Sequence, residues 1–206
     1  SVVIFRSPES NTILLKDEVI SSLVPEPRSV RNQLGPDDAP VTLVEYADLC
    51  CPQCREAFPK IHELIGKYPG RIRIVYRHFP IFNLPGHEMS TYAIIASEIA
   101  AQKGKFWQFA DAFVAAQEAP RTQEGVNEIA QTVGVTAEEI VAASQDTASQ
   151  PNKNLARDFK EALEIFDIKS TPTFMLYVKG QPVKKLLLMG MLAELETPEY
   201  QKLLKP

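Results

Sequence analysis

The chain has 206 residues, of which 45% are hydrophobic and 23% are charged, enough apolar material to bury a globular core without help from disulfides. Its net charge is −4, from 22 basic and 26 acidic residues. This balance, with no basic stripe along the sequence, excludes a typical nucleic-acid-binding protein. No uncharged apolar run approaches the roughly 18 residues that cross a bilayer.

In chain order, the first segment is predicted to be an arm that is interrupted repeatedly by proline and glycine. A short strand is expected at 2–5 and a short helix or strand at 13–23. The first well-defined strand is expected at 41–46, where a nearly continuous apolar run is typical of burial on both faces of a sheet. A helix at 52–68 and a strand at 71–77 follow it.

The middle of the chain is predicted to be helical, because apolar residues recur there at helical spacing. The helices are expected at 88–102, 105–117, 125–133, 137–144 and 152–166. Thr136 and Glu139 make the capping-box pattern at the start of the helix at 137–144. The aromatic residues Phe106, Trp107, Phe109 and Phe113 are predicted to lie in the core of this helical block, with a binding box as the alternative.

The last part of the chain returns to a strand pattern. Strands at 173–178 and 183–189 are separated by a short turn and are therefore predicted to pair as a hairpin. A final helix is expected at 198–204. The whole order is β-α-β, a helical block, and then β-β-α, which indicates an α/β fold.

The chain has three cysteines, which lie within five consecutive positions at Cys50, Cys51 and Cys54. This clustering excludes a disulfide scaffold and indicates a local chemical device. Cys51 immediately precedes Pro52, a residue favoured at the first position of a helix. At a helix N-terminus, unpaired amides stabilise a thiolate and lower a cysteine pKa from about 8.5 to between roughly 3.5 and 7.5. Cys54 is expected to be more buried, so that one thiol attacks and the other resolves.

The alternative for the clustered cysteines is half of a zinc site. A closed tetrahedral site needs four ligands, and the chain has no second cysteine pair. The histidines His62, His78 and His87 have a spacing that matches no zinc template. The sequence therefore favours redox chemistry over metal binding, and it predicts neither a metal nor a cofactor.

Three motifs carry a resemblance to a known family. They are Glu45 followed by Cys51-Pro-Gln-Cys54, the segment Gly104-Lys-Phe-Trp107, and the segment Thr171-Pro-Thr-Phe174. Together they resemble the DsbA-like thiol:disulfide oxidoreductases of the thioredoxin superfamily, over about residues 36–205. The resemblance implies a thioredoxin-like domain (36–78 and 167–206) and an inserted helical domain (79–166), and it does not cover the predicted N-terminal arm (1–35).

The resemblance also implies a role for each matching residue. Cys51 is the expected nucleophile and Cys54 the resolving thiol, with Pro52 and Gln53 between them facing the substrate. Thr171 and Pro172 resemble the segment that carries a cis-proline in this family and presents its backbone to a substrate chain; a plain proline at a strand entry is the alternative.

Glu45 matches the family's buried acidic residue beneath the dithiol, which would carry the proton of Cys54. The alternative is a carboxylate at a sheet edge that reaches solvent, because a carboxylate in a buried strand is costly unless it is neutral or paired.

Four features depart from the motif or stand beside it. Gln53 replaces the histidine of the strongest oxidants in the family, which leaves the strength of oxidation open. Cys50 is interpreted as a buried small hydrophobe, with a competing disulfide or a modification as the alternatives. Asp48 is interpreted as a polar loop residue, with tuning of the thiolate as the alternative. Phe79, Ile81, Phe82 and Leu84 lie in a proline-rich loop that either packs on the core or forms a patch for unfolded substrates.

The resulting hypothesis is an enzyme that donates its Cys51–Cys54 disulfide to exported proteins. The resemblance implies an extracytoplasmic or periplasmic location, unfolded or reduced protein substrates, and reoxidation by a quinone-linked membrane partner. A monomer is expected, either free or tethered to the membrane by a segment outside this chain. The alternatives are a reductase or isomerase that uses the same dithiol, and a peptide-binding chaperone whose cysteines are incidental.

Overall fold

The computed structural model describes residues 5–6, 12–14, 32–116 and 118–205. Most of the elements expected at 2–5 and 13–23 lie outside these residues. The chain divides into two compact units, one made of Ser1–Tyr46, Pro59–Arg77 and Pro172–Pro206, and one made of Ala47–Phe58 and His78–Thr171. The predicted boundaries of the arm and of the inserted domain stay predictions.

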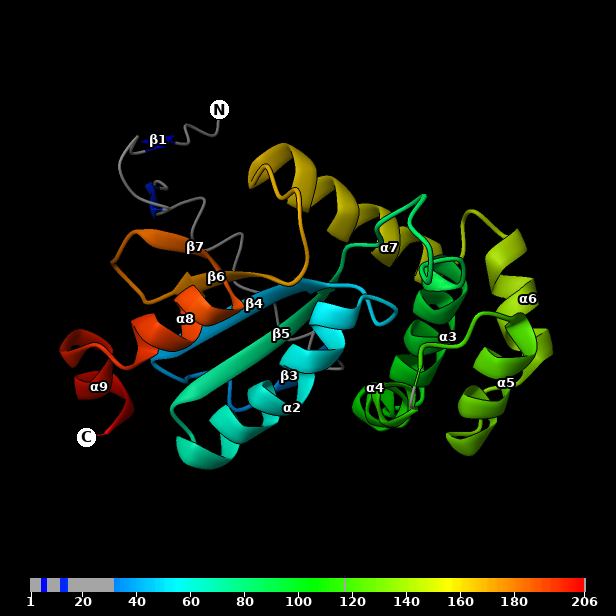
Figure 1. Ribbon diagram of the computed structural model, residues 1–206, viewed down its shortest axis with the longest axis horizontal. Coiled ribbons are helices and arrows are strands. Elements are labelled where there is room, and N and C mark those ends of the chain that lie inside the picture. The colour runs from blue at the N-terminus through cyan, green and yellow to red at the C-terminus, as the bar shows by residue number, and fades with distance from the viewer. Residues whose placement is uncertain (1–4, 7–11, 15–31, 117, 206) are drawn as a thin grey trace. The chain divides into compact units, whose positions relative to one another are not determined.

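The first unit is built on a mixed sheet. Among the described residues, seven strands pair in the order β1-β2-β7-β6-β4-β5-β3 (Figure 1). Their bounds are Phe5–Arg6 (β1), Thr12–Leu14 (β2), Gln33–Leu34 (β3), Val41–Ala47 (β4), Ile72–His78 (β5), Thr173–Tyr177 (β6) and Val183–Leu187 (β7). The predicted β4, β5 and β6–β7 hairpin are therefore present, and β4 lies between β6 and β5.

The central strands of the sheet are covered on both faces. Every residue of β4 and of β5 is buried, as expected for continuous apolar strands inside a layered fold. At the opposite edge from β1, Leu34 pairs with Ile74. The next residue, Gly35, has φ of +79°, and a Cβ there would lie 2.0 Å from the carbonyl oxygen of Ile72, so only glycine fits this close approach.

Helices also contribute residues to the first unit, and the start of one of them forms part of the site. Helix α2 spans Pro52–Lys67, close to its predicted bounds, and carries Pro59 inside it. Helices α8 (Leu188–Leu195) and α9 (Pro198–Leu204) follow the hairpin. The sequence prediction missed α8 and extended β7 to residue 189. The strand ends at Leu187 because its last partner, Thr173, is the first residue of β6.

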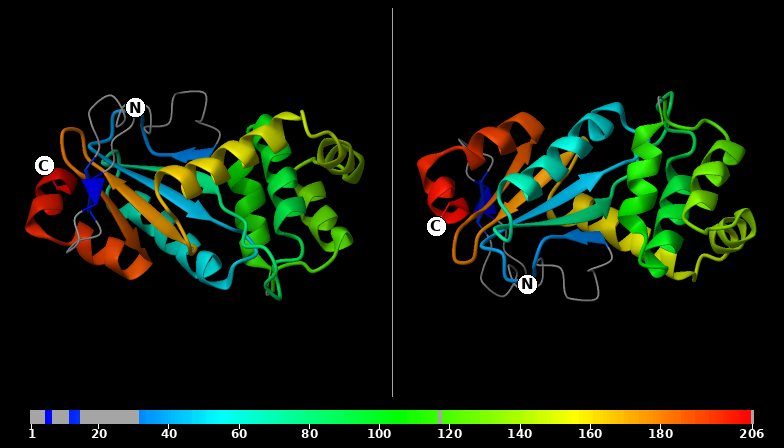
Figure 2. Two further views of the ribbon diagram at one scale, coloured as in Figure 1. Left: turned by 90° about the horizontal axis from the view of Figure 1, so that it is seen from above. Right: turned by 90° about the horizontal axis from the view of Figure 1, so that it is seen from below.

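The second unit is mainly helical. Its helices are α3 (Ser90–Gln102), α4 (Phe106–Ala115), α5 (Gln123–Thr132), α6 (Ala137–Gln145), α7 (Gln150–Lys160) and the π-helical turn η2 (Glu161–Ile165). Helix α3 contacts each of α4, α5, α6 and α7, and Figure 2 shows α3 to α6 gathered side by side. This central position explains the composition of α3, whose alanines and isoleucines are buried almost all round.

The predicted cap of the helical block is confirmed, and so is its predicted core except at Trp107. Phe106, Phe109 and Phe113 are each at most 1% exposed, whereas Trp107 is only partly buried. At the start of α6, the Thr136 hydroxyl accepts from the Glu139 amide while the Glu139 carboxylate accepts from the Thr136 amide, so two amides that the helix leaves unpaired are satisfied. In the part of the chain that the structure describes, no helix is both long and apolar enough to span a bilayer.

Candidate active site

Strand pairing brings the cysteine motif and the Thr171-Pro172 segment to the same end of the sheet. Strand β4 ends at Ala47 and leads into residues 48–54, which we call the dithiol loop. Strand β6 begins at Thr173, directly after the Thr171-Pro172 segment. Tyr46 pairs with Thr173 in the antiparallel register. Residues separated by more than a hundred positions thus meet where the cysteines begin.

Cys51 directly precedes the first residue of α2 and has its thiol free, as do the other two cysteines. Its Sγ lies 3.3 Å from Oε1 of Gln53 and 3.8 Å from the carbonyl oxygen of Thr171. A hydrogen bond with Cys54, supported by the backbone of Cys54 and Gln53 in the first turn of the helix, lowers the pKa of Cys51 from its ordinary 9.0 to about 6, despite partial burial. This is the shift predicted for a thiol at a helix N-terminus.

Cys54 lies in the first turn of α2 and is 4% exposed. Burial, and then the hydrogen bond and charge of Cys51, raise its pKa well above the ordinary value. The backbone N–H of Asp48 points at its Sγ from 3.5 Å. The two thiols of the motif are therefore unequal: one is readily ionised and the other holds its proton.

Cys50 is buried, as the sequence interpretation of a small hydrophobe predicted. Burial, followed by the charge of Asp48, raises the pKa of this thiol to about 12. A hydrogen bond with Ser90 opposes that shift only in part. The Cys50 thiol therefore holds its proton firmly, although its neighbour in the chain, Cys51, has the lowest pKa of the three thiols.

Asp48 is buried and makes several polar contacts, although the sequence interpretation took it for a polar loop residue. Its side chain is inaccessible to solvent. Oδ1 accepts from the Cys50 amide at 2.9 Å, and Oδ2 accepts from the Ser90 hydroxyl at 2.6 Å and the Ile81 amide at 3.2 Å. Nδ1 of His87 lies 2.9 Å from the same Oδ2. No local sequence signal marks Ser90, Ile81 or His87 as partners, because each lies more than 30 positions away in the chain.

Glu45 occupies the middle of the buried β4 strand and is 1% exposed. Opposite it in the register is Phe174, and neither carboxylate oxygen has a hydrogen-bond partner among the described residues. Burial alone raises the pKa of this carboxyl to about 8. The alternative of an edge carboxylate in contact with solvent is therefore wrong, and the side chain is neutral below about pH 8.

The predicted substrate-facing residues divide by exposure. Pro52 and Gln53 are exposed, whereas Thr171 and Pro172 are buried. Pro52 also lines a pocket of the second unit together with Cys50 and Arg55 on one wall; the remaining lining residues are Pro85, Gly86, Glu118, Ala119 and Arg121. A concave surface that begins one residue from the nucleophile is a candidate place for a substrate chain.

The loop between β5 and α3 is only partly apolar surface. Phe79 is buried and stacks on Phe159, with ring centroids 5.1 Å apart. Phe82 and Leu84 are about half exposed, at 55% and 49%. The two sequence alternatives for this loop, core packing and an exposed patch, therefore each describe part of it.

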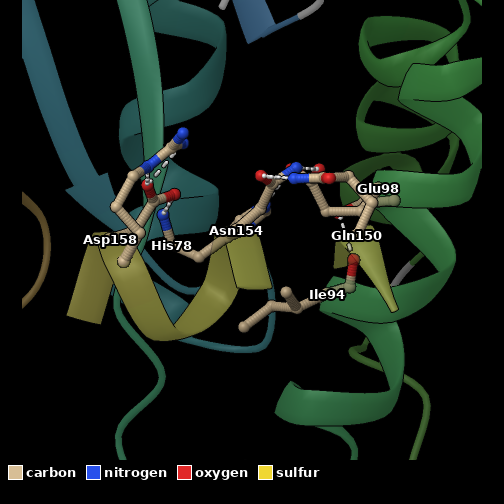
Figure 3. A network of polar contacts seen from close by, with 8 residues as sticks. His78, Ile94, Glu98, Gln150, Asn154 and Asp158 are labelled. Carbon is tan, nitrogen blue, oxygen red and sulfur yellow. Dashed lines mark hydrogen bonds and ion pairs between the residues drawn. The ribbon is translucent and has the colours of Figure 1, made fainter. Parts of the chain in front are cut away.

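A second buried polar network was also missed by sequence reasoning (Figure 3). Nε2 of His78, the last residue of β5, lies 2.8 Å from Oε1 of Glu98 in α3, and the His78 amide donates to Asp158 in α7 at 3.0 Å. Asn154 of α7 donates to the other Glu98 oxygen at 2.5 Å. The network ties α3 and α7 to the end of β5 and gives His78 a structural role.

The alternative of a zinc site concerns the cysteines and histidines. Within the described ranges, no group of three or more histidine, cysteine, aspartate or glutamate side chains is placed to hold a metal ion. His78 and His87 each face a buried carboxylate instead, Glu98 and Asp48 respectively.

Comparison with known proteins agrees with this fold. The family model described as thioredoxin matches residues 30–187, so the chain belongs to the thioredoxin family. The predicted thioredoxin-like α/β fold with a helical insertion is confirmed.

Two solved structures show the relation in more detail. A thioredoxin-like oxidoreductase from Silicibacter pomeroyi is 26% identical, with a TM-score of 0.61 over 82% of this chain and 95% of that one. BdbD from Bacillus subtilis, in its oxidised form, is 24% identical, with a TM-score of 0.62 over 85% and 93% of the two chains. The architecture predicted from the DsbA-like motifs is thus the architecture of these proteins.

A relative of another kind matches by sequence. A Na⁺/H⁺ antiporter, NhaA 3 of Salinispora tropica, is 39% identical over 100 residues, which are 48% of this chain and 15% of the antiporter. Across the antiporters compared, this chain spans 15% to 25% of their length. A sequence of this kind therefore also occurs as a segment of much longer proteins.

Proposed function

We propose that this chain is a thiol:disulfide oxidoreductase that introduces disulfides into exported proteins through Cys51 and Cys54. The observation that carries the proposal is the opposite direction of the two pKa shifts, lowered at Cys51 and raised at Cys54. A stabilised thiolate favours the reduced enzyme, and an enzyme whose reduced form is the more stable one oxidises its substrates.

The reaction is two thiol–disulfide exchanges. A substrate thiolate attacks Sγ of Cys51 in the enzyme disulfide, so that the Cys51–Cys54 bond breaks, Cys54 leaves as a thiolate and takes up a proton, and a mixed disulfide forms. A second substrate thiolate then attacks the substrate sulfur of that mixed disulfide and releases the Cys51 thiolate. Two substrate thiols become one disulfide, and the enzyme disulfide becomes a dithiol.

The proposed substrate-binding residues surround the nucleophile. The contact between Cys51 and the carbonyl of Thr171 supports a role for Thr171 and Pro172 in presenting backbone groups to a substrate chain. Pro52 and Gln53 are exposed beside the reactive sulfur, which supports their contact with the residues that flank the substrate cysteine. The pocket lined by Pro52 and Arg55 extends that surface.

Glu45 is the proposed proton carrier for Cys54. A carboxyl whose pKa is about 8 can hold and release a proton near neutral pH, as a general acid or base must. The strand that holds it leads into the dithiol loop within three residues. In this role Glu45 would protonate the leaving Cys54 thiolate in oxidation and take the proton back when the disulfide is restored.

The proposed setting follows from the DsbA-like architecture. Substrates are unfolded or reduced exported proteins, the compartment is extracytoplasmic, and a quinone-linked membrane partner restores the disulfide. The enzyme acts as a monomer, either free or tethered through a segment outside this chain. The similarity to segments of antiporters supports a membrane association for at least some relatives of the chain.

Trapping of the mixed disulfide tests the proposal. The Cys54→Ala variant, mixed with an oxidised model peptide, should accumulate a covalent adduct at Cys51, because the resolving thiol that would release it is missing. Cys51→Ala should form no adduct, since Cys54 and Cys50 hold their protons. An adduct at Cys50, or none in Cys54→Ala, would contradict the assignment of the nucleophile.

The alternatives are separated by two further readouts. A reductase or isomerase would reduce insulin efficiently and would require the same cysteines. A chaperone with incidental cysteines would keep its protection of unfolded substrates when Cys51 and Cys54 are both replaced by alanine. The proposal requires disulfide formation in a reduced substrate to vanish in that double variant.

A further inference from the structure

A third thiol beside a reactive pair creates a chemical problem. If Cys50 ionised, its thiolate could attack Sγ of Cys54 in the Cys51–Cys54 disulfide, which would form a Cys50–Cys54 bond and release the Cys51 thiolate. No oxidant is needed, because one disulfide replaces another. The mispaired enzyme would hold its nucleophile in the reduced state and could not oxidise a substrate.

Asp48 contacts the dithiol loop at each of the three cysteines. Its carboxylate accepts from the Cys50 amide at 2.9 Å, its carbonyl accepts from the Cys51 amide at 2.9 Å, and its own amide donates to the sulfur of Cys54 at 3.5 Å. The first contact fixes the backbone at Cys50.

The second oxygen of Asp48 anchors the loop that covers Cys50. Ser90, Ile81 and His87 all place a polar group within 3.2 Å of it. One buried carboxylate therefore holds both the backbone at Cys50 and three residues of the chain between β5 and the start of α3.

The environment so formed keeps Cys50 unreactive. The side chain is 2% exposed although it forms part of a pocket wall. Burial and the negative charge of Asp48 raise its pKa to about 12, so the thiol keeps its proton near neutral pH. The attacking species in disulfide exchange is the thiolate. Cys50 is therefore protected by its burial, which blocks access to the sulfur, and by the charge of Asp48, which disfavours its thiolate.

We propose that Asp48 is a positioning residue that holds the Cys50 thiol out of disulfide exchange, so that oxidation pairs Cys51 with Cys54 alone. The inference rests on the proposed function, since it concerns the partner choice of the same dithiol. It assigns to Asp48 a part in the fidelity of the site, and no contact with the substrate.

Disulfide mapping of full-length oxidised protein tests this assignment. Wild type, Asp48→Asn and Asp48→Ala are oxidised with glutathione disulfide, quenched with acid, and mapped by peptide mass spectrometry. Asp48→Asn keeps the size of the side chain but loses its charge and one of its two acceptor oxygens. We expect disulfides that contain Cys50 to rise at least about tenfold in the Asp48 variants. Asp38→Asn, the same change at an exposed position, should match wild type.

Rescue separates this role from a loss of folding. Cys50→Ser in the Asp48→Asn background should restore both the Cys51–Cys54 pairing and the rate of substrate oxidation, because the competing thiol is gone. Exclusive Cys51–Cys54 pairing in folded Asp48→Asn, or no rescue by Cys50→Ser, would overturn the inference. Failure of the proposed function has a different signature, since wild type would then pair Cys51 with Cys54 and still oxidise no substrate.

Discussion

At the scale of single residues, the site depends on how differently three neighbouring thiols are treated. Cys51 is stabilised as a thiolate by Cys54 and the backbone at the start of α2, whereas burial favours the protonated forms of Cys54 and Cys50. This difference in thiol pKa arises within five consecutive residues. It determines that Cys51 attacks and Cys54 resolves.

Titration of Cys51 follows from this arrangement. In the reduced protein, the thiolate absorbance and the rate of alkylation at Cys51 should rise with a midpoint near pH 6, because its pKa is lowered to about 6. Cys50→Ser should leave the midpoint unchanged, whereas Cys51→Ser should abolish the transition. A midpoint at or above the free-cysteine value of about 8.5 would contradict the account.

Glu45 makes a prediction about stability and pH. The folded carboxyl keeps its proton up to about pH 8, while the unfolded one releases it near 4.5. The folded state therefore binds more protons between these values, and its stability falls as the pH rises. At about 1.4 kcal/mol per pKa unit, the loss between pH 5 and pH 8 is roughly 3 kcal/mol.

Urea unfolding of the oxidised protein measures this effect without interference from the thiols of the motif. Glu45→Gln should flatten the decline of the unfolding free energy between pH 5 and pH 8. Glu63→Gln, the same change at an exposed position of α2, should keep the decline. A Glu45→Gln protein with the wild-type slope would show that this carboxyl is not the titrating group.

Sequence reasoning identified the residues whose neighbours are close in the chain. Cys51 and Cys54 could be found because a three-residue spacing and a following proline specify their geometry locally. Asp48 and His78 could not, because their partners lie 20 to 80 positions away and only the folded chain brings them together. A polar residue in a loop carries no sign of whether it will be buried.

At the scale of elements, Arg55 connects the first turn of α2 to the end of α4. Its guanidinium donates to the carbonyl oxygens of Phe113 at 2.9 Å and Val114 at 3.3 Å, and also to that of Ala116. A cation at a helix C-terminus satisfies carbonyls that have no partner within the helix and opposes the negative end of its dipole. The helix that carries Cys54 is thus fastened to the helical block.

Replacement of Arg55 by methionine should loosen this junction. We expect the free energy of unfolding to fall by about 1–3 kcal/mol, because charged hydrogen bonds are lost at three carbonyls. Arg55→Lys should lose less, since it keeps the charge but not the forked donors. Urea unfolding reads both variants, and a change within about 0.5 kcal/mol for Arg55→Met would contradict a fastening role.

The elements themselves were predicted where periodicity is long and unambiguous. Strand β4, helix α3 and the β6–β7 hairpin lie close to their expected positions, and the capping box of α6 is present. Helix α8 was missed because Leu188–Leu195 continues the apolar run of β7. The change from strand to helix there depends on where the partner strand begins, which no local pattern encodes.

At the scale of the whole molecule, the dithiol loop follows a strand of the sheet in the chain but groups with the helical block. It is reached directly from the sheet through β4, yet Ala47–Phe58 belongs to the same compact unit as α3 to α7. Asp48 and Arg55 account for this grouping, because each bonds the loop to the helical part of the chain. A helical insertion therefore contributes to the chemistry of a thioredoxin-like site as well as to its size.

The central claim is that the Cys51–Cys54 pair is an oxidant, and its reduction potential tests that claim most directly. Equilibration in glutathione buffers, followed by quantification of both redox forms, gives the value. A Cys51 pKa of about 6 predicts a potential more positive than the roughly −270 mV of thioredoxin, towards the −120 mV of DsbA. A potential at or below about −270 mV would contradict the account and identify the pair as a reductant.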